Sequence, residues 1–155
     1  PNHQTGRVTP IDIRGNVAYF GTFGYELDLN KLSKEEFEAV KKQVEFMKAN
    51  RELIQFGDFY RLRSPFETDQ AAWMVVSEDK KKAIVGFYCL RSNVNALPGF
   101  LRLEGLDPDK LYRMEGREYY GDELMNMGIT LSEFYDKGFT ISKDYDSFVT
   151  VIEEV

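Results

Sequence analysis

The sequence of 155 residues contains one cysteine and one histidine, and it has no long apolar run. With Cys89 alone, an internal disulfide is impossible and a metal site built from several cysteines is excluded. This cysteine usage fits a reducing compartment, and we expect a cytoplasmic protein. No apolar run approaches the roughly 20 residues that cross a membrane, so we expect no membrane partner. The residues also suggest no metal and no cofactor.

Positive charge is scarce as well. The formal net charge is −6, from 20 basic and 26 acidic residues, which argues against nucleic-acid binding through phosphate contacts. Three consecutive lysines, Lys80, Lys81 and Lys82, are better interpreted as the solvated tip of a turn. The sequence begins with Pro1, and its first residues do not resemble a signal peptide. We therefore expect a further portion of the protein upstream.

The clearest element in the sequence is a helix between Ser33 and Gly57. Ser33 is suited to cap its N-terminus, and Glu36, three residues later, completes a capping box. Apolar residues recur at helical spacing and form one stripe. The stripe consists of Phe37, Val40, Val44, Met47 and Ile54. We expect it to pack against the β-region that follows, or otherwise to be left open to solvent or to a partner.

A second helix and a strand precede this helix. Thr9 as the N-cap and Pro10 at the first helical position predict a helix that runs to about Phe20. Its inward residues are expected to be Ile13, Val17 and Phe20. Residues 22–29 predict a short strand. Helix, strand and helix in succession are typical of parallel α/β structure, and because one strand cannot bury its own faces, partner strands are expected upstream.

From residue 58 onward the pattern changes to short segments with the period of β-strands. Apolar runs at residues 71–77 and 82–90, joined by a charged tip, predict a hairpin. Both faces of the first run are apolar, as expected of a central strand, and Trp73 is expected to be buried. Further strands are predicted at residues 59–63, 100–103, 111–114 and 148–152. Asp122 is expected to cap a single helical turn that ends at Gly128. Together these strands predict an antiparallel β-sandwich.

Several motifs, in the same order along the chain, resemble glycoside hydrolase family 36, the bacterial-type α-galactosidases. The first group is PNHQTGR at residues 1–7, TP at 9–10, NVA at 16–18, FG at 20–21 and GYELD at 24–28. The second group is RELIQ at 51–55, FYRL at 59–62, SP at 64–65, AWM at 72–74, GLD at 105–107 and GDELMN at 121–126. The match is specific up to about Gly128, whereas residues 129–155 resemble the family less clearly.

This resemblance implies a mostly β fold in two parts. Residues 1–57 would be the last α/β elements of a (β/α)8 barrel, and residues 58–155 would form a C-terminal antiparallel β-sandwich domain. The partners implied are the remainder of the barrel and further copies of the protein in a homo-oligomer. The barrel assignment agrees with the separate expectation of missing upstream strands.

The resemblance also implies an activity, the retaining hydrolysis of terminal α-linked galactose in α-galactoside oligosaccharides. The family uses two aspartates from earlier barrel strands, one of them in a Trp-Asp context. Here the only tryptophan, Trp73, lies between Ala72 and Met74. No residue of the chain matches either catalytic motif, so we assign no catalytic residue. The chain would complete the barrel and supply the β-domain, and by itself it would be inactive.

Substrate-binding candidates lie at the expected mouth of the barrel. Their amide, imidazole, guanidinium and carboxylate groups are suited to sugar hydroxyls. The candidates are Asn2, His3, Gln4, Arg7 and Asp28. A structural hydrogen bond is the alternative role for His3, and Asp28 could equally mark the entry to a helix.

Two other interpretations of the β-domain stay open. It could bind carbohydrate independently of catalysis, which a row of exposed aromatic residues on one sandwich face would favour. It could instead serve stability and oligomerisation, which an apolar edge or patch would favour. The pair Tyr119 and Tyr120 is compatible with either role.

Overall fold

The computed structural model describes residues 4–92, 99–131 and 144–155. It contains a six-stranded antiparallel sheet in the order β1-β2-β3-β8-β5-β6. The strands of this sheet are β1 (Asp58–Arg63), β2 (Gln70–Val76), β3 (Lys82–Cys89), β5 (Leu111–Met114), β6 (Arg117–Tyr120) and β8 (Asp146–Glu154). The predicted mostly β fold with an antiparallel C-terminal sandwich is confirmed.

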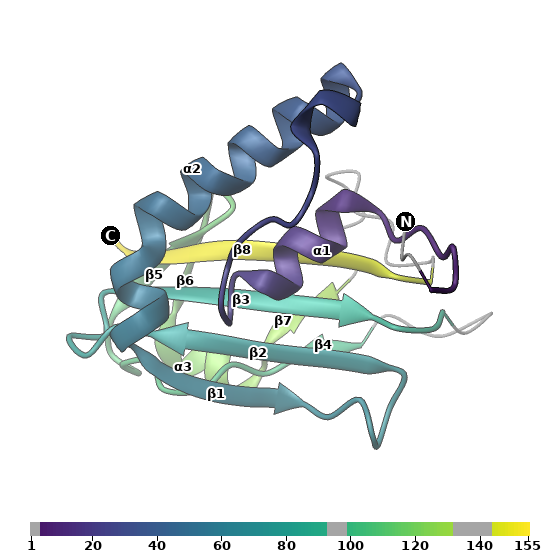
Figure 1. The fold of residues 1–155 in the computed structure, drawn as a ribbon. Coiled ribbons are helices and arrows are strands. Elements are labelled where there is room, and N and C mark those ends of the chain that lie inside the picture. The colour runs from purple at the N-terminus through teal and green to yellow at the C-terminus, as the bar shows by residue number, and fades with distance from the viewer. Residues whose placement is uncertain (1–3, 93–98, 132–143) are drawn as a thin grey trace.

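The two faces of the large sheet are covered differently (Figure 1). A two-stranded sheet of β4 (Phe100–Leu101) and β7 (Ile129–Thr130) lies on one side with the short helix α3 (Gly121–Asn126). Helices α1 (Ile11–Ala18) and α2 (Lys34–Phe56) lie on the other, and α1 contacts β3, β8 and α2. No helix in the described ranges is long and apolar enough to cross a membrane.

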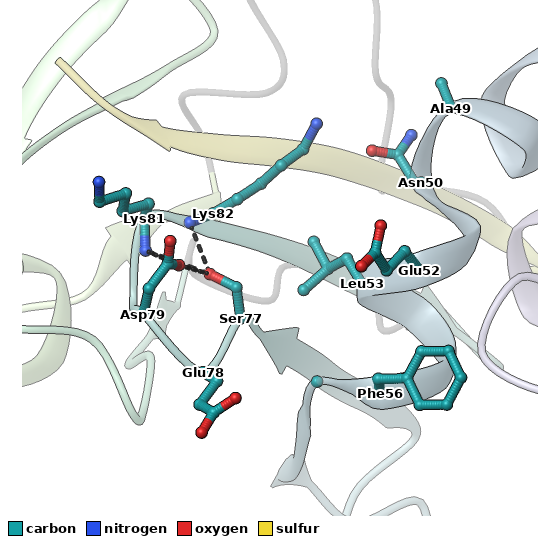
Figure 2. Close-up of a pocket in the computed structure, with 11 residues that line it drawn as sticks. Ala49, Asn50, Glu52, Leu53, Phe56, Ser77, Glu78, Asp79, Lys81 and Lys82 are labelled. Atoms are coloured by element: carbon teal, nitrogen blue, oxygen red, sulfur yellow. Dashed lines mark hydrogen bonds between the residues drawn. The ribbon is translucent and has the colours of Figure 1, made fainter.

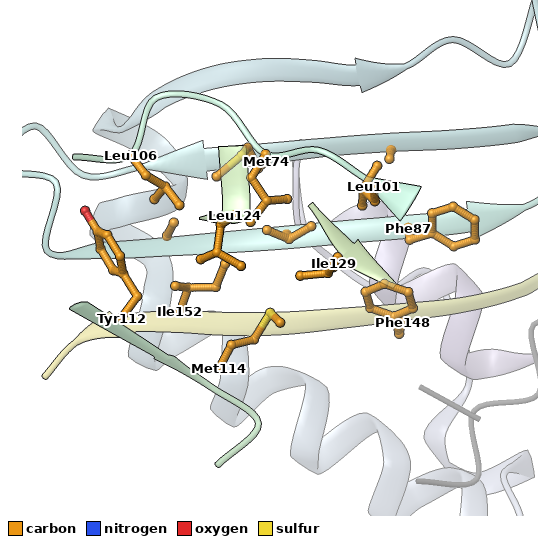
Figure 3. Close-up of a cluster of buried hydrophobic side chains, with 14 of the residues drawn as sticks. Met74, Phe87, Leu101, Leu106, Tyr112, Met114, Leu124, Ile129, Phe148 and Ile152 are labelled. Carbon is orange, nitrogen blue, oxygen red and sulfur yellow. The ribbon is translucent and has the colours of Figure 1, made fainter. Parts of the chain in front are cut away.

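The main core lies between the large sheet and the β4–β7 side (Figure 3). Alternation along the strands divides the side chains between the two faces. On β2 and β3, Met74 and Phe87 enter this core, whereas Trp73 and Tyr88 belong to a second cluster with Ile13 of α1. Trp73 is half-buried rather than buried as predicted, and its ring packs against those of Phe20 and Tyr88.

Helix α2 begins and ends as predicted. The Ser33 hydroxyl accepts a hydrogen bond from the Glu36 N–H at 3.2 Å, and the Glu36 carboxylate accepts one from the Ser33 N–H at 3.0 Å. At the other end, the Gly57 N–H donates to the Leu53 carbonyl. Most of the apolar stripe is buried or half-buried, but Phe37 is 46% exposed. Phe37, which lies in the first turn, is therefore the residue of the stripe that the described chain leaves open.

Helix α1 differs from its prediction in two details. Pro10 is the N-cap residue, and no side chain caps the helix, so the capping role predicted for Thr9 is wrong. Val17 is exposed rather than inward. The contacts explain this orientation, because Asn16 faces the sheet, where its Nδ2 donates to Ser147 Oγ at 2.9 Å, while Gly15 faces α2.

The strand predicted at residues 22–29 is absent from the described structure. These residues have no ladder partner, and the last of them, Leu29, begins a three-residue 3-10 helix, η1 (Leu29–Lys31). A β-strand needs a neighbouring strand to which it can hydrogen-bond. Every described strand of both sheets comes after residue 57, and none of them pairs with residues 22–29.

The cap predicted for the short helix is also misplaced. Tyr120, not Asp122, is the N-cap residue of α3, and its N–H donates to the Glu123 carboxylate at 2.7 Å. Gly128 follows the helix with a φ of +81°, the left-handed conformation that glycine adopts easily.

Candidate functional site

The predicted sugar-contacting residues lie on the exposed N-terminal segment and at the entry to η1. Asn2 and His3 fall outside the described residues. Gln4 and Arg7 are exposed, and the Arg7 N–H donates to Thr5 Oγ1 at 3.4 Å. Asp28 accepts a hydrogen bond from the Asn30 N–H at 3.0 Å and pairs with Lys31 at 3.8 Å. Asp28 therefore does mark a helix entry, and the sugar-binding roles stay predictions.

The segment between α1 and α2 keeps the side-chain alternation of a strand although it lacks strand partners. Three alternate residues are half-buried: Phe23, Tyr25 and Leu27. The alternate residues are exposed: Thr22, Gly24, Glu26 and Asp28. The two faces of the segment are thus already distinct in chemistry, one aromatic and one small or acidic.

Aromatic rings attach the half-buried face to the helices. The ring centroids of Tyr19 and Phe23 are 5.4 Å apart in a stacked pair, and those of Phe23 and Tyr25 are 5.3 Å apart edge to face. Tyr19 also packs against Phe46 of α2 at 4.5 Å. Burial raises the pKa of both the Tyr19 and the Tyr25 phenol, which reflects how far this aromatic contact is removed from water.

A buried glutamine ties the same segment to both helices. Gln43 of α2 is 6% exposed, and its Oε1 accepts a hydrogen bond from the Tyr25 hydroxyl at 2.5 Å. Its Nε2 donates to the Ile11 carbonyl at 3.0 Å. A Cβ at Gly15 would lie 2.3 Å from that Nε2, so a side chain there would displace it. Gln43 was not predicted as a site residue, because its only signal in the sequence is a polar residue beside an apolar stripe.

A pocket of about 740 Å³ lies between the end of α2 and the turn that joins β2 to β3 (Figure 2). Ser77 organises the turn, because its hydroxyl donates to Asp79 and accepts from the N–H groups of Lys81 and Lys82. The Ser77 hydrogen bond lowers the pKa of the Asp79 carboxyl. A general acid for glycoside cleavage needs a raised pKa, so Asp79 is unsuited to that role.

The chain matches two family models in succession. Residues 70–152 match the glycosyl hydrolase family 36 C-terminal domain. Residues 1–57 match the Melibiase model.

Curated relatives agree with these matches. The chain is 51% identical over 132 residues to alpha-galactosidase AgaA of Geobacillus stearothermophilus, covering 84% of the chain and 18% of that protein. It is 44% identical over 139 residues to the bifunctional alpha-galactosidase/sucrose kinase AgaSK of Mediterraneibacter gnavus, covering 88% of the chain and 15% of that protein. The chain thus spans less than a fifth of the length of these relatives.

Solved structures have the same fold. A complex of AgaA from Geobacillus stearothermophilus with raffinose superposes with a TM-score of 0.91 at 45% identity, over 100% of this chain and 21% of that one. The alpha-galactosidase from Lactobacillus brevis superposes with a TM-score of 0.90 at 42% identity, over the same shares of the two chains. The sequence resemblance is confirmed, and the chain belongs to glycosyl hydrolase family 36, whose C-terminal region it matches.

Proposed function

We propose that this chain is the C-terminal part of an α-galactosidase that hydrolyses terminal α-linked galactose with retention. In this proposal residues 1–57 close a (β/α)8 barrel and residues 58–155 form the β-domain. The observation that carries the proposal is the pair of consecutive matches, Melibiase at residues 1–57 and the C-terminal domain at residues 70–152. The 51% identity to an alpha-galactosidase supports it.

The chain itself supplies structure rather than the cleaving groups. Retaining hydrolysis needs two carboxyl groups about 5–5.5 Å apart, one of which has a raised pKa. Three described carboxylates have structural roles instead: Glu36 caps α2, Asp79 accepts a hydrogen bond in a turn, and Glu153 forms a surface ion pair. The Asp144 carboxyl accepts hydrogen bonds from Ser92, which lower its pKa. We therefore expect no turnover by the 155-residue chain alone.

The residues proposed to line the sugar site are those at the barrel mouth. Asn2, His3, Gln4, Arg7 and Asp28 have polar groups suited to galactose hydroxyls. Gln4, Arg7 and Asp28 are exposed in this chain, which leaves them accessible to a ligand or to the preceding part of the protein. Their individual replacement by alanine should raise KM for an α-galactoside.

The deciding experiment compares the 155-residue chain with the full-length protein at equal concentration on a chromogenic α-galactoside. The matching β-galactoside serves as the control substrate. We expect turnover of the α-anomer by the full-length protein only. Turnover by the chain alone would contradict the assignment of catalysis to the preceding part, and an inactive full-length protein would overturn the α-galactosidase proposal.

We further propose that the full-length protein is cytoplasmic and a homo-oligomer. Exposed apolar side chains of the β-domain support an interface, among them Phe66 at 98% and Phe100 at 58% exposure. Light scattering on the purified protein would give its mass in solution, and cell fractionation would give its location. A monomer, or a protein found outside the cytoplasm, would contradict this proposal.

A further inference from the structure

The pocket between the end of α2 and the turn that joins β2 to β3 has on its wall a buried polar atom without a partner in the described chain. Asn50 of α2 lines this pocket and is 6% exposed. Its Nδ2 donates to the Phe46 carbonyl at 2.9 Å, whereas its Oδ1 accepts no hydrogen bond from the described residues. Because buried polar atoms of native proteins almost always have a partner, this oxygen calls for a donor from outside the described chain.

Two donors on the pocket wall are engaged elsewhere. Figure 2 shows the Asn50 carboxamide on the α2 wall, with its oxygen turned toward the side of the pocket where the Lys82 side chain lies. The Lys82 Nζ pairs instead with Glu153 Oε1 of β8, at 2.9 Å. The Ser77 hydroxyl donates to Asp79 within the turn. Neither group therefore supplies the donor that the Asn50 oxygen lacks.

The charges on the wall of the pocket favour a neutral ligand. Glu52 of α2, and Glu78 and Asp79 of the turn, carry negative charge, while Lys81 and Lys82 carry positive charge. The carboxylates would repel an anion and the ammonium groups would repel a cation, so neither kind of ion matches the whole wall. A neutral molecule with several hydroxyl groups can use both, because carboxylates accept hydrogen bonds from hydroxyls and ammonium groups donate to them.

The rim and the size of the pocket suit a sugar ring. Phe56, the last residue of α2, lines the pocket and is 80% exposed, and Leu53 and Ala49 extend the apolar part of the wall. The face of an aromatic ring carries partial negative charge and attracts the weakly positive C–H groups on one side of a sugar ring. The volume of about 740 Å³ lies within the roughly 300–1,000 Å³ of small-molecule sites. An oligosaccharide needs such an apolar platform beside hydrogen-bonding groups of both kinds.

We infer that this pocket binds a neutral oligosaccharide, with Phe56 stacking on one sugar ring and Asn50 Oδ1 accepting a hydrogen bond from a hydroxyl. The χ2 torsion of asparagine is broad, so a small rotation of the carboxamide brings the buried oxygen to a ligand in the pocket. Glu52 supplies a further acceptor from α2, and Lys81 supplies a donor from the turn. All these groups belong to the described chain, and the site binds sugar without cleaving it. Only the choice of an α-galactoside as the probe rests on the proposed function.

The first test measures how far stachyose protects an introduced thiol in the full-length protein. A49C places the thiol on the pocket wall, and the matched control K41C places one at an exposed position of α2 that does not line the pocket. Alkylation of each thiol is followed by peptide mass, in reactions short enough that most of the stachyose remains. The galactose released in the same reactions reports the proposed hydrolysis separately. Stachyose should slow alkylation of A49C and leave that of K41C unchanged.

The two readouts keep the inference and the proposed function apart. Galactose release without protection of A49C would overturn the inference, and so would equal protection of A49C and K41C. Protection of A49C alone, in a protein that releases no galactose, would overturn the proposed reaction while supporting the sugar site. An A49C thiol that is unreactive with and without stachyose would mean that the preceding part of the protein covers the pocket, which would also overturn the inference.

The second test assigns the contacts by substitutions made together with A49C. N50L should raise the stachyose concentration that gives half-protection about ten-fold, the equivalent of one hydrogen bond. F56A should raise it as well, whereas F66A, at a 98% exposed phenylalanine that does not line the pocket, should leave it unchanged. Protection that survives both N50L and F56A would overturn the inference.

Hydrogen exchange separates a ligand-binding Asn50 from a structural one. N50L removes an acceptor that has no partner in the described chain and buries an apolar side chain in its place. Exchange at residues 46–56 of the sugar-free full-length protein should therefore stay unchanged or become slower. Faster exchange there in N50L would show that Asn50 holds the end of α2 in place, and would overturn its assignment to the ligand.

Discussion

The β-domain and the helical region before it bury their large apolar side chains to different degrees. In the β-domain, Met74, Phe87 and Ile152 have no exposed surface. In the helical region, Val17 and Phe37 are each 46% exposed and Leu29 is 51% exposed. The core of the β-domain thus contains large apolar side chains with no exposed surface, whereas the most buried ones of the helical region keep 5–8% of theirs exposed: Ile13, Tyr19, Val40 and Met47.

The difference follows from how many layers surround each region. The large sheet is covered by β4, β7 and α3 on one face and by the helices on the other (Figure 1). The helices have the sheet beneath them and no further described layer above. Apolar burial contributes about 25 cal/mol per Å² removed from water, so the β-domain should dominate the stability of this chain. Four predictions, from the largest effect to the smallest, test that contrast.

Replacing a large side chain of the main core should have the largest effect. Phe148 stacks on Phe87 with ring centroids 5.5 Å apart, and both are buried. Phe148→Ala should lower the free energy of unfolding by about 3–5 kcal/mol, through lost burial and the cavity left behind. Urea denaturation of the chain measures this, with Phe66→Ala at a 98% exposed position as the control. Equal losses in the two variants would remove the contrast between the regions.

Removing the buried glutamine should have a smaller and more local effect. Gln43→Leu leaves the Tyr25 hydroxyl and the Ile11 carbonyl without their partner, at a cost of about 1–3 kcal/mol. Hydrogen exchange should accelerate at residues 19–28 and change little in β2, β3 and β8. Gln55→Leu, at an exposed position of the same helix, is the matched control. If exchange instead accelerated equally throughout the sheet, the helical region would not be a separate layer.

These two regions also differed in how far the sequence predicted them. The predicted N-terminus of α2 was correct because a capping box depends only on two residues that are three apart, Ser33 and Glu36. The predicted end at Gly57 was also correct. The hairpin of β2 and β3 was correct because its two strands are adjacent in sequence. The strand at residues 22–29 was wrong because a strand depends on neighbours, and this chain offers it none in the described ranges. Val17 was misplaced because the contacts of Asn16 and Gly15 set the rotation of α1, which helical spacing alone does not determine.

The candidate site was predictable only in part. The polar residue types at the start of the chain suggested a sugar-binding mouth, but their geometry depends on strands that precede them. Gln43 could not be found from the pattern, because it lies next to Val44 in a stripe defined by apolar residues.

Loss of the N-terminal cap of α2 should cost about 1 kcal/mol. Ser33→Ala removes the acceptor for the Glu36 N–H, and such substitutions typically destabilise by that amount. Ser33→Asp, which restores an acceptor, is the control and should recover most of the loss. The measurement is the urea midpoint, with helix content followed by circular dichroism. An unchanged midpoint in Ser33→Ala would show that the first turn of α2 frays without consequence in this chain.

The smallest effect is expected at an ion pair on the surface of the β-domain. Lys82 and Glu153 are register partners on β3 and β8, with Nζ and Oε1 2.9 Å apart. Their side chains are 35% and 60% exposed, so water and salt screen the pair, and exposed pairs contribute about 0.2–1 kcal/mol. Lys82→Met keeps the aliphatic stem, and with Glu153→Gln it completes a double-mutant cycle that isolates the charge interaction.

The coupling energy from that cycle should decrease when salt is raised, because the Debye length falls from about 10 Å at 0.1 M to about 3 Å at 1 M. A coupling energy above about 2 kcal/mol that is insensitive to salt would mean that charges, and not packing alone, stabilise the β-domain. The expected small and screened value would instead assign the stability of the β-domain to its buried side chains. It would also sharpen the contrast with the helical region, where one buried glutamine is predicted to contribute more than this surface ion pair.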